Sequence, residues 1–199
     1  MVLSSNLGYP RIGSNRELKW LLESFWKKKI NEISLFENIS KIKKDNWIKQ
    51  RKAGIHFIPS NDFSLYDHVL DMCLTVDAVP DRFKKLKNKK KNTLELYFAM
   101  ARGYQSGRID IKAMEMTKWF DTNYHYIVPE FKSKQKFKLT FSKIIDEFLE
   151  AKNLSIITRP VILGPLSFLY LGKSISKKFN KLSLLSKLLP VYTQIFKSL

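Results

Sequence analysis

Short apolar segments that end in small polar residues alternate along this chain with longer stretches of helical periodicity. In GIHFIPSNDF at 54–63, a short apolar strand passes directly into Ser, Asn and Asp. In RPVILGPLSFLYLG at 159–172, the run VIL predicts a buried strand that continues into a Gly-Pro turn. Strands that alternate with helices are typical of βα units around a parallel sheet. The sequence therefore predicts an α/β fold, with polar residues gathered at the carboxyl ends of its strands.

Amphipathic helices are predicted between these segments. Ser14 and Asn15 are candidate caps of the first helix. Apolar side chains at helical spacing indicate helices at about 16–30, 34–52, 66–76, 93–103, 137–153 and 181–199. About four strands fit between them, whereas a closed (β/α)8 barrel requires eight strands and typically about 250 residues. The chain has 199 residues, so either the fold is smaller than a barrel or the chain is part of something larger.

The net charge of +18 is the feature of the composition that most needs an explanation. Clustered Lys and Arg neutralise phosphates, so one interpretation is a basic nucleic-acid-binding protein. The dense basic run, KKLKNKKKN at 84–92, is instead typical of a solvated loop, and we find none of the usual nucleic-acid-binding motifs. We favour A+T-rich codon usage as the source of the lysines and predict no nucleic-acid partner.

The chain also lacks the sequence features of membrane and secreted proteins. No window approaches the roughly 18 uninterrupted apolar residues of a membrane-spanning helix. The N-terminal residues MVLSSNLGYPRIG lack the basic-then-apolar pattern of a signal peptide. A single cysteine, Cys73, rules out an internal disulfide framework. We therefore expect a cytoplasmic chain with no membrane partner.

The titratable residues do not predict a catalytic or metal centre within the chain. His56, His68 and His125 are far apart in sequence, and one thiol cannot supply a Cys-rich zinc site. Asp67 beside His68 could form a carboxylate–imidazole pair, but a structural hydrogen bond is the more common use of such a histidine. Cys73 lies in the apolar stretch DMCLTV and is predicted to pack in the core. No G-x-S-x-G elbow and no Gly-rich phosphate loop is present, so we predict no catalytic residue and no bound metal.

The first turn of the first helix is a candidate anion-binding segment. Arg16, Glu17 and Lys19 lie there, where free N–H groups and the positive end of the helix dipole attract a carboxylate or phosphate. Arg16 could pair with two oxygens of such a group, and Lys19 could add a mobile charge. A normally charged helix start is the alternative interpretation.

The segment MEMTKWFDTNYHYIVPEF at 114–131 is a second candidate because it mixes polar groups with aromatic rings. Lys118 precedes Trp119 and Phe120, so its stem is expected to pack while its ammonium faces a partner. Asn123 offers both donors and acceptors, which suits the edge of a heterocycle, and the rings could form a platform for a flat ligand. A purely structural aromatic cluster is the alternative.

Four blocks of the chain carry a resemblance to a known family. They are GYPRIGSNRELKWLLESFW, AGIHFIPSNDFSLYDHVLD, AMEMTKWFDTNYHYIVPEF and RPVILGPLSFLYLGK, in that order. Together they resemble the start of cobalamin-independent methionine synthase, over practically the whole chain. That family transfers a methyl group from 5-methyltetrahydropteroyltriglutamate to homocysteine and is built from two (β/α)8 barrels. The resemblance implies that residues 1–199 form an incomplete N-terminal (β/α)8 (TIM-type) barrel, a half-barrel of about four strands.

The resemblance also implies roles for individual residues. It assigns contacts with the folate substrate to Arg16, Glu17, Leu18 and Lys19 in the first helix and to Lys118 and Asn123. Zinc, its ligands and the homocysteine site belong to the family's C-terminal barrel, which we expect to be absent here. The expected function is that of a folate-binding N-terminal portion, from a truncated product or part of a longer chain, that performs no methyl transfer alone. A decayed remnant and a basic nucleic-acid-binding protein are the alternatives.

Overall fold

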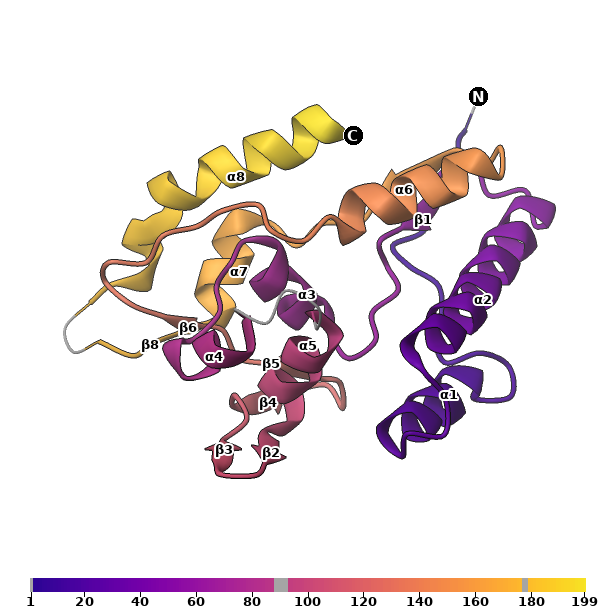
Figure 1. Cartoon of the computed structure of the whole chain (residues 1–199). Coiled ribbons are helices and arrows are strands. Elements are labelled where there is room, and N and C mark those ends of the chain that lie inside the picture. The colour runs from indigo at the N-terminus through magenta and orange to yellow at the C-terminus, as the bar shows by residue number, and fades with distance from the viewer. Residues whose placement is uncertain (1, 88–92, 177–178) are drawn as a thin grey trace. The chain divides into compact units, whose positions relative to one another are not determined.

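The computed structural model describes residues 2–87, 93–176 and 179–199 (Figure 1). The chain divides into two compact units, each built from two stretches of sequence. The first unit comprises Met1–Leu65 and Lys143–Ile162, and the second comprises Tyr66–Ser142 and Leu163–Leu199. The fold is mixed α/β, with helices and short strands, and the described residues form no closed barrel.

The first unit is a pair of parallel strands with helices from both ends of its sequence. Its elements are α1 (Glu17–Trp26), α2 (Glu32–Lys52), β1 (Ile58–Ser60), α6 (Lys143–Asn153) and β7 (Thr158–Pro160). β1 and β7 run parallel with Ile58 opposite Thr158, and Ser5 forms a parallel bridge to Phe57. The predicted parallel pairing is thus confirmed for these strands.

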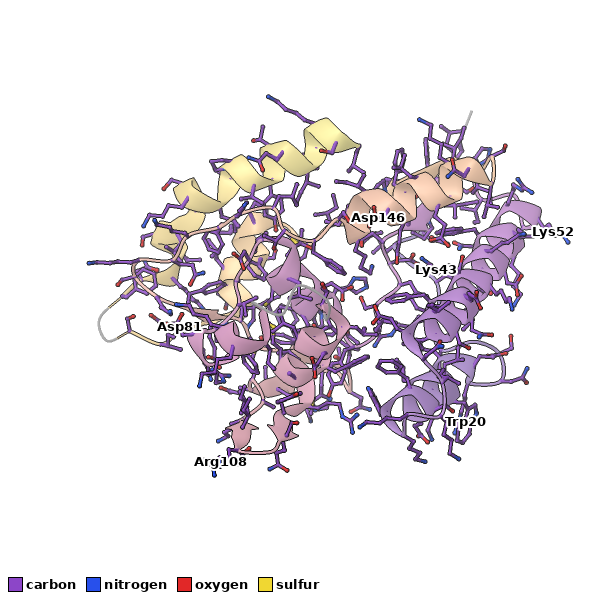
Figure 2. All side chains as sticks on the ribbon, viewed as in Figure 1. Trp20, Lys43, Lys52, Asp81, Arg108 and Asp146 are labelled. Atoms are coloured by element: carbon purple, nitrogen blue, oxygen red, sulfur yellow. The ribbon has the colours of Figure 1, made fainter. Side chains whose placement is uncertain are left out.

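Helices α2 and α6 pack against the β1–β7 pair. The buried centre is formed by Trp47, Ile58, Ala151 and Ile156. The indole Nε1 of Trp47 donates a hydrogen bond of 3.1 Å to the carbonyl oxygen of Pro59, so the ring satisfies its polar atom while it packs. At the edge of this contact, Lys43, labelled on α2 in Figure 2, forms ion pairs with α6, of 3.5 Å to Glu147 and 2.5 Å to Glu150.

The second unit contains the remaining helices and strands. Its helices are α3 (His68–Thr75), η1 (Asp81–Phe83), α4 (Lys84–Lys87), α5 (Thr93–Arg102), α7 (Pro165–Leu171), η2 (Lys181–Leu184) and α8 (Leu185–Ser198). Its strands are β2 (Tyr104–Ser106), β3 (Ile109–Ile111), β4 (Met116–Lys118), β5 (His125–Ile127), β6 (Glu130–Phe131) and β8 (Lys173–Ser174). β2 with β3 and β4 with β5 form antiparallel hairpins, and β6 runs parallel to β8.

The core of the second unit is apolar and closely packed around Phe131. The rings of Phe131 and Phe168 meet edge to face with centroids 5.4 Å apart, and both side chains are fully buried. A Cβ atom on Gly172 would lie 2.2 Å from Cε2 of Phe131, so glycine is needed where the end of α7 passes the ring. Cys73 is buried here as predicted, and burial raises the pKa of its thiol well above the ordinary value.

Several expectations from the sequence need correction. The predicted strand VIL at 161–163 is wrong, because the strand is Thr158–Pro160 and only the Val161 amide continues the ladder, donating to the Ser60 carbonyl. Gly164 and Pro165 do not form a turn but begin α7, since proline at the first helical position needs no amide partner. The helix expected from 137 begins only at Lys143. The β2–β3 hairpin was not predicted.

Two further predictions concern the basic run and membranes. The run at 84–92 was predicted to be a solvated loop, which is wrong for its described part, since Lys84–Lys87 form α4 and Leu86 is buried. Positions 88–92 fall outside the described residues. Every helix in the described ranges is too short or too polar to cross a membrane.

Candidate ligand-binding segments

The turn before α1 is closed by a carboxylate of the helix itself. Glu17 accepts hydrogen bonds from the backbone amide of Asn15 (3.0 Å) and from its side-chain amide (3.3 Å). Gly13 has a φ angle of 83°, and a Cβ atom there would lie 1.9 Å from Oε2 of Glu17. Arg16, the N-cap residue, is also left-handed, with a φ angle of 61°. The loop is therefore wrapped tightly onto the first turn of the helix.

Most of the amides that could bind an anion at this helix start already have partners. The Leu18 amide donates to the Ile12 carbonyl (3.2 Å), and the Arg16 amide donates to the Gly13 carbonyl (3.3 Å). The backbone amide of Glu17 itself, followed by that of Asn15, lowers the pKa of the Glu17 carboxyl group. An external anion at this segment would therefore meet the side chains of Arg16 and Lys19 more readily than the amides.

Arg16 and Lys19 are exposed, whereas Leu18 is not. The Leu18 side chain is 3% exposed and packs in the core of the first unit. The Nζ atom of Lys19 lies 3.9 Å from the Glu23 carboxylate and 4.8 Å from the centroid of the Trp20 ring. The Trp20 side chain is itself 53% exposed. This side of α1 thus presents cations beside an accessible aromatic ring.

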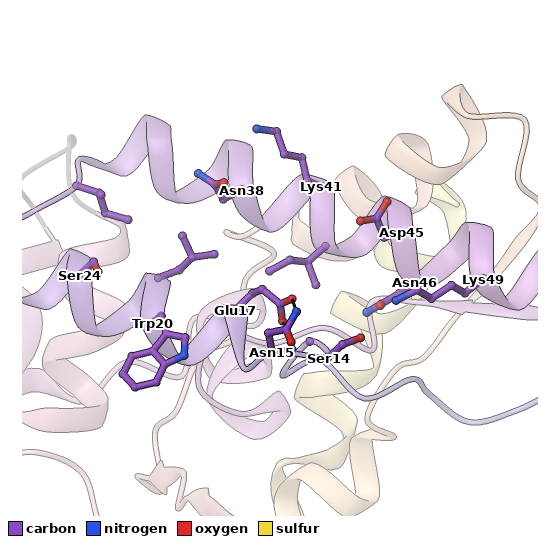
Figure 3. A pocket seen from close by; sticks show the side chains of 14 residues that line it. Ser14, Asn15, Glu17, Trp20, Ser24, Asn38, Lys41, Asp45, Asn46 and Lys49 are labelled. Carbon is purple, nitrogen blue, oxygen red and sulfur yellow. Dashed lines mark hydrogen bonds between the residues drawn. The ribbon is translucent and has the colours of Figure 1, made fainter.

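A groove with a volume of about 560 Å³ runs between α1 and α2. Among the candidate residues, Glu17 lines it, together with Asn15, and the two lie side by side below α2 in Figure 3. The same view shows Lys41 pointing away from α1, and the Asn38 side-chain amide donates to the Ser34 carbonyl on its own helix (2.8 Å). These two polar groups of the groove therefore do not meet Glu17.

The second segment is the β4–β5 hairpin of the other unit. Lys118 lies opposite His125 in the register, and the Trp119 amide donates to the Tyr124 carbonyl (2.7 Å). The tip is closed further by Thr122, whose hydroxyl donates to the Trp119 carbonyl (2.6 Å). The structure thus brings Lys118 and Asn123 together at the exposed end of one hairpin.

The rings of this hairpin pack mainly on one another. Trp119 meets Phe120, Tyr124 and Tyr126 edge to face, with centroids 5.5, 6.4 and 5.8 Å apart. Such edge contacts are typical of a structural cluster and do not build a flat platform. Phe120 and Tyr124 are nevertheless 65% and 39% exposed, so ring surface is accessible beside Asn123.

The polar residues after β1 hold loops in place. The side-chain amide of Asn61, a residue with a φ angle of 56°, donates to the Val161 carbonyl (2.7 Å) and accepts from Lys143 (2.9 Å). The Asp62 carboxylate accepts from the Tyr9 amide (2.8 Å), and burial raises the pKa of this carboxyl group to about 6. The predicted gathering of polar residues at this strand end is real, but its groups bind one another.

The described part of the chain contains no suitable set of metal ligands. Across residues 2–87, 93–176 and 179–199, no three His, Cys, Asp or Glu side chains form a group that could hold a metal ion. The described residues therefore offer no ligand set for zinc, whose ligands the resemblance assigns to the C-terminal barrel. The Asp67 carboxylate, which the sequence placed beside His68, binds backbone amides of α3 and β5.

Comparison with known proteins shows a single family over nearly the whole chain. Residues 3–199 match the family described as "Cobalamin-independent synthase, N-terminal domain". The chain is 54% identical over 196 residues to the 5-methyltetrahydropteroyltriglutamate–homocysteine methyltransferase of Flavobacterium johnsoniae, covering 98% of this chain and 25% of that protein. The protein of the same name in Parvibaculum lavamentivorans is 52% identical, and the match covers 100% of this chain and 26% of that protein. The one in Dictyostelium discoideum is 47% identical, and the match covers 99% of this chain and 28% of that protein. The chain thus spans about a quarter of the length of these curated relatives.

Proposed function

The chain belongs to the cobalamin-independent methionine synthase family, of which it matches the N-terminal domain, and we propose that it is the folate-binding N-terminal portion of such an enzyme. In this proposal the full-length protein transfers a methyl group from 5-methyltetrahydropteroyltriglutamate to homocysteine in methionine biosynthesis. Homocysteine and zinc bind to the other parts of that protein. The family match over residues 3–199 carries the proposal.

In the first unit, we propose that Arg16 and Lys19 bind the polyglutamate tail. Each glutamate adds a carboxylate, and an exposed guanidinium and an exposed ammonium can both form charge-assisted hydrogen bonds with such groups. Glu17 and Leu18 support this segment, because the Glu17 carboxylate holds Asn15 and the Leu18 side chain fixes the helix in the core.

In the second unit, we propose that Lys118 and Asn123 provide a further set of contacts with the same substrate. Both are exposed at the hairpin end, and the Asn123 amide can donate to and accept from the edge of a pterin ring. The exposed rings of Phe120 and Tyr124 offer apolar surface beside it.

We also propose that residues 1–199 are a half-barrel, the first part of the wall of a (β/α)8 barrel. The parallel pairs β1–β7 and β6–β8 and the parallel Ser5–Phe57 bridge support this proposal. Parallel sheets are normally covered on both faces and continued by neighbouring strands. The remaining strands would come from other parts of the family-length protein, which is about four times as long as this chain.

Calorimetric titration of the 199-residue chain with 5-methyltetrahydropteroyltriglutamate tests the proposal. We expect binding that is tighter than binding of the monoglutamate form, and we expect R16A/K19A to weaken it by about tenfold or more. The control is K27A, because Lys27 lies 3.8 Å from the same Glu23 carboxylate that Lys19 approaches. Equal affinity for the triglutamate and monoglutamate folates would refute the proposal that Arg16 and Lys19 bind the tail. A loss of affinity in K27A as large as that in R16A/K19A would refute it as well.

Methyl transfer is tested separately with the same chain. With homocysteine, zinc and the triglutamate folate present, we expect no methionine above background, since the described residues hold no metal site. Turnover by the 199 residues would overturn this part of the proposal. A monodisperse chain with a cooperative melt would also exclude the alternative of a decayed remnant.

A further inference from the structure

A fully buried carboxylate connects the start of α3 to the β4–β5 hairpin. Asp67 has no exposed surface. Its Oδ1 accepts from the amides of Val69 (2.7 Å) and Leu70 (2.9 Å), which caps α3, while its Oδ2 accepts from the amide of Ile127 (3.1 Å) on β5. One side chain therefore serves as helix cap and as an anchor for a strand of the hairpin.

The hairpin leaves the Ile127 amide without a partner on β4. Cross-strand hydrogen bonds join Trp119 to Tyr124 and Glu115 to Val128. Because such bonds recur at every second residue in an antiparallel pair, the Ile127 amide points to the outer side of β5. A buried amide on that side requires another acceptor, and Asp67 provides it.

We propose that Asp67 is a positioning residue that fixes the hairpin carrying Lys118 and Asn123. Ile127 lies two residues from His125, which faces Lys118 in the register. A second bond holds the same strand, since the Tyr126 hydroxyl donates to the Leu171 carbonyl (3.0 Å). Because Tyr126 and Ile127 are both held, the exposed end of the β4–β5 hairpin has a defined position. The assignment of Lys118 and Asn123 as folate contacts rests on the proposed function.

A carboxylate does here what an amide side chain cannot. Asparagine at position 67 can still cap α3 through one oxygen, because Asn caps helices about as well as Asp. Its NH2 group would then face the Ile127 amide, donor against donor, and the buried amide would lose its acceptor. The variant D67N therefore separates the capping role from the anchoring role.

The matched control is Asp71, one turn further along α3. Asp71 is also buried, and it accepts from the Tyr97 hydroxyl (2.8 Å) through an oxygen that asparagine retains. D71N thus removes a neighbouring buried carboxylate while it keeps the acceptor of the Tyr97 hydroxyl. D67S serves as a second test variant, since a serine hydroxyl can cap α3 but is too short to reach β5 as well.

Amide hydrogen exchange by NMR on the 199-residue chain tests the anchor directly at pH 8, above the Asp67 pKa of about 7, where both carboxylate oxygens can accept. In D67N and D67S we expect the Ile127 amide to exchange about tenfold faster or more, with Val69 and Leu70 nearly unchanged. The amide chemical shifts of Lys118 and Asn123 should move in both variants and not in D71N. Unchanged exchange at Ile127, or shifts confined to α3, would show that Asp67 is only a helix cap and would overturn the proposal.

Titration with 5-methyltetrahydropteroyltriglutamate then separates this proposal from the proposed function. If wild type binds, D67N should weaken binding by about fivefold or more, and D71N should not. Faster exchange at Ile127 with unaltered affinity would refute the link to binding. If wild type does not bind, the proposed function fails, whereas the exchange and chemical-shift data still decide whether Asp67 positions the hairpin.

Discussion

Replacement of Gly172 by alanine is expected to destabilise the second unit through a steric conflict that can be located in advance. The backbone there is extended, so alanine meets no conformational penalty. Its Cβ would lie 2.2 Å from Cε2 of Phe131 and 2.9 Å from the Pro129 carbonyl oxygen. The ring is fully buried against Phe168, and the carbonyl accepts from the Lys173 amide (2.7 Å), so neither can move freely.

The size of the effect follows from the cost of overpacking a core. An added methyl group that displaces a packed ring typically costs about 1–3 kcal/mol, and the rigid carbonyl places G172A in the upper part of that range. Shortening the ring with F131L creates a cavity and costs about 1–3 kcal/mol alone. Since F131L removes the atom that the methyl group strikes, we expect the double variant to lose about 1 kcal/mol less than the sum of the single variants.

Urea unfolding followed by circular dichroism measures these free energies. The control is G164A, at the other end of α7, where a Cβ atom would have no neighbour closer than 3.9 Å. We expect G164A to cost about 1 kcal/mol or less, because alanine is a poorer N-cap than glycine but also reduces the entropy of the unfolded chain. If G172A were as stable as G164A, or if its effect simply added to that of F131L, the steric argument would be refuted.

Two further predictions concern buried charges. Burial raises the Asp67 pKa from 3.8 to about 7, so the folded state binds more protons than the unfolded state between about pH 4 and pH 7. The contribution of this group to the free energy of unfolding should therefore fall by up to about 4 kcal/mol as pH rises through that range. If the free energy of unfolding of the wild type fell no more steeply with pH than that of D67N, this prediction would be contradicted. Arg82 binds the buried Glu130 carboxylate through two hydrogen bonds of 2.6 and 3.0 Å, so R82M should cost about 2–4 kcal/mol in urea unfolding and R82K clearly less. If R82M and R82K lost the same free energy of unfolding, the two parallel hydrogen bonds from Arg82 to Glu130 would contribute nothing to stability.

The helices were predictable from the sequence because their apolar spacing is local. Leu35, Ile39, Ile42 and Trp47 already mark one side of α2, and the structure buries all of them but Ile42, which is half-buried. The strands were harder, since each spans only two or three residues and depends on partners far along the chain, as in the pairing of Ile58 with Thr158. Nothing local in the sequence indicates that β7 ends at Pro160, before the apolar run at 161–163.

The candidate residues divide in the same way. Their chemical types were visible in the sequence. The closure of the helix start by Glu17 was not predictable, because it depends on a left-handed Gly13 that brings Asn15 over the first turn. Asp67 was missed as an anchor, because its partner Ile127 lies 60 residues away in sequence.

The closed helix start determines how salt should affect recognition of the substrate. If amides at the start of α1 bound the polyglutamate tail, the contacts would be partly buried and only weakly screened. The Leu18 amide is already bonded to the Ile12 carbonyl, so in the proposed function the exposed charges of Arg16 and Lys19 bind the tail. Exposed ion pairs weaken strongly as ionic strength rises, because the Debye length falls from about 10 Å at 0.1 M to about 3 Å at 1 M. We therefore expect the affinity for the triglutamate folate to fall several-fold between these salt concentrations, while the affinity for the monoglutamate form changes much less. A preference for the triglutamate that persists at 1 M salt would show that the amides of the first turn, and not the side chains, bind the tail.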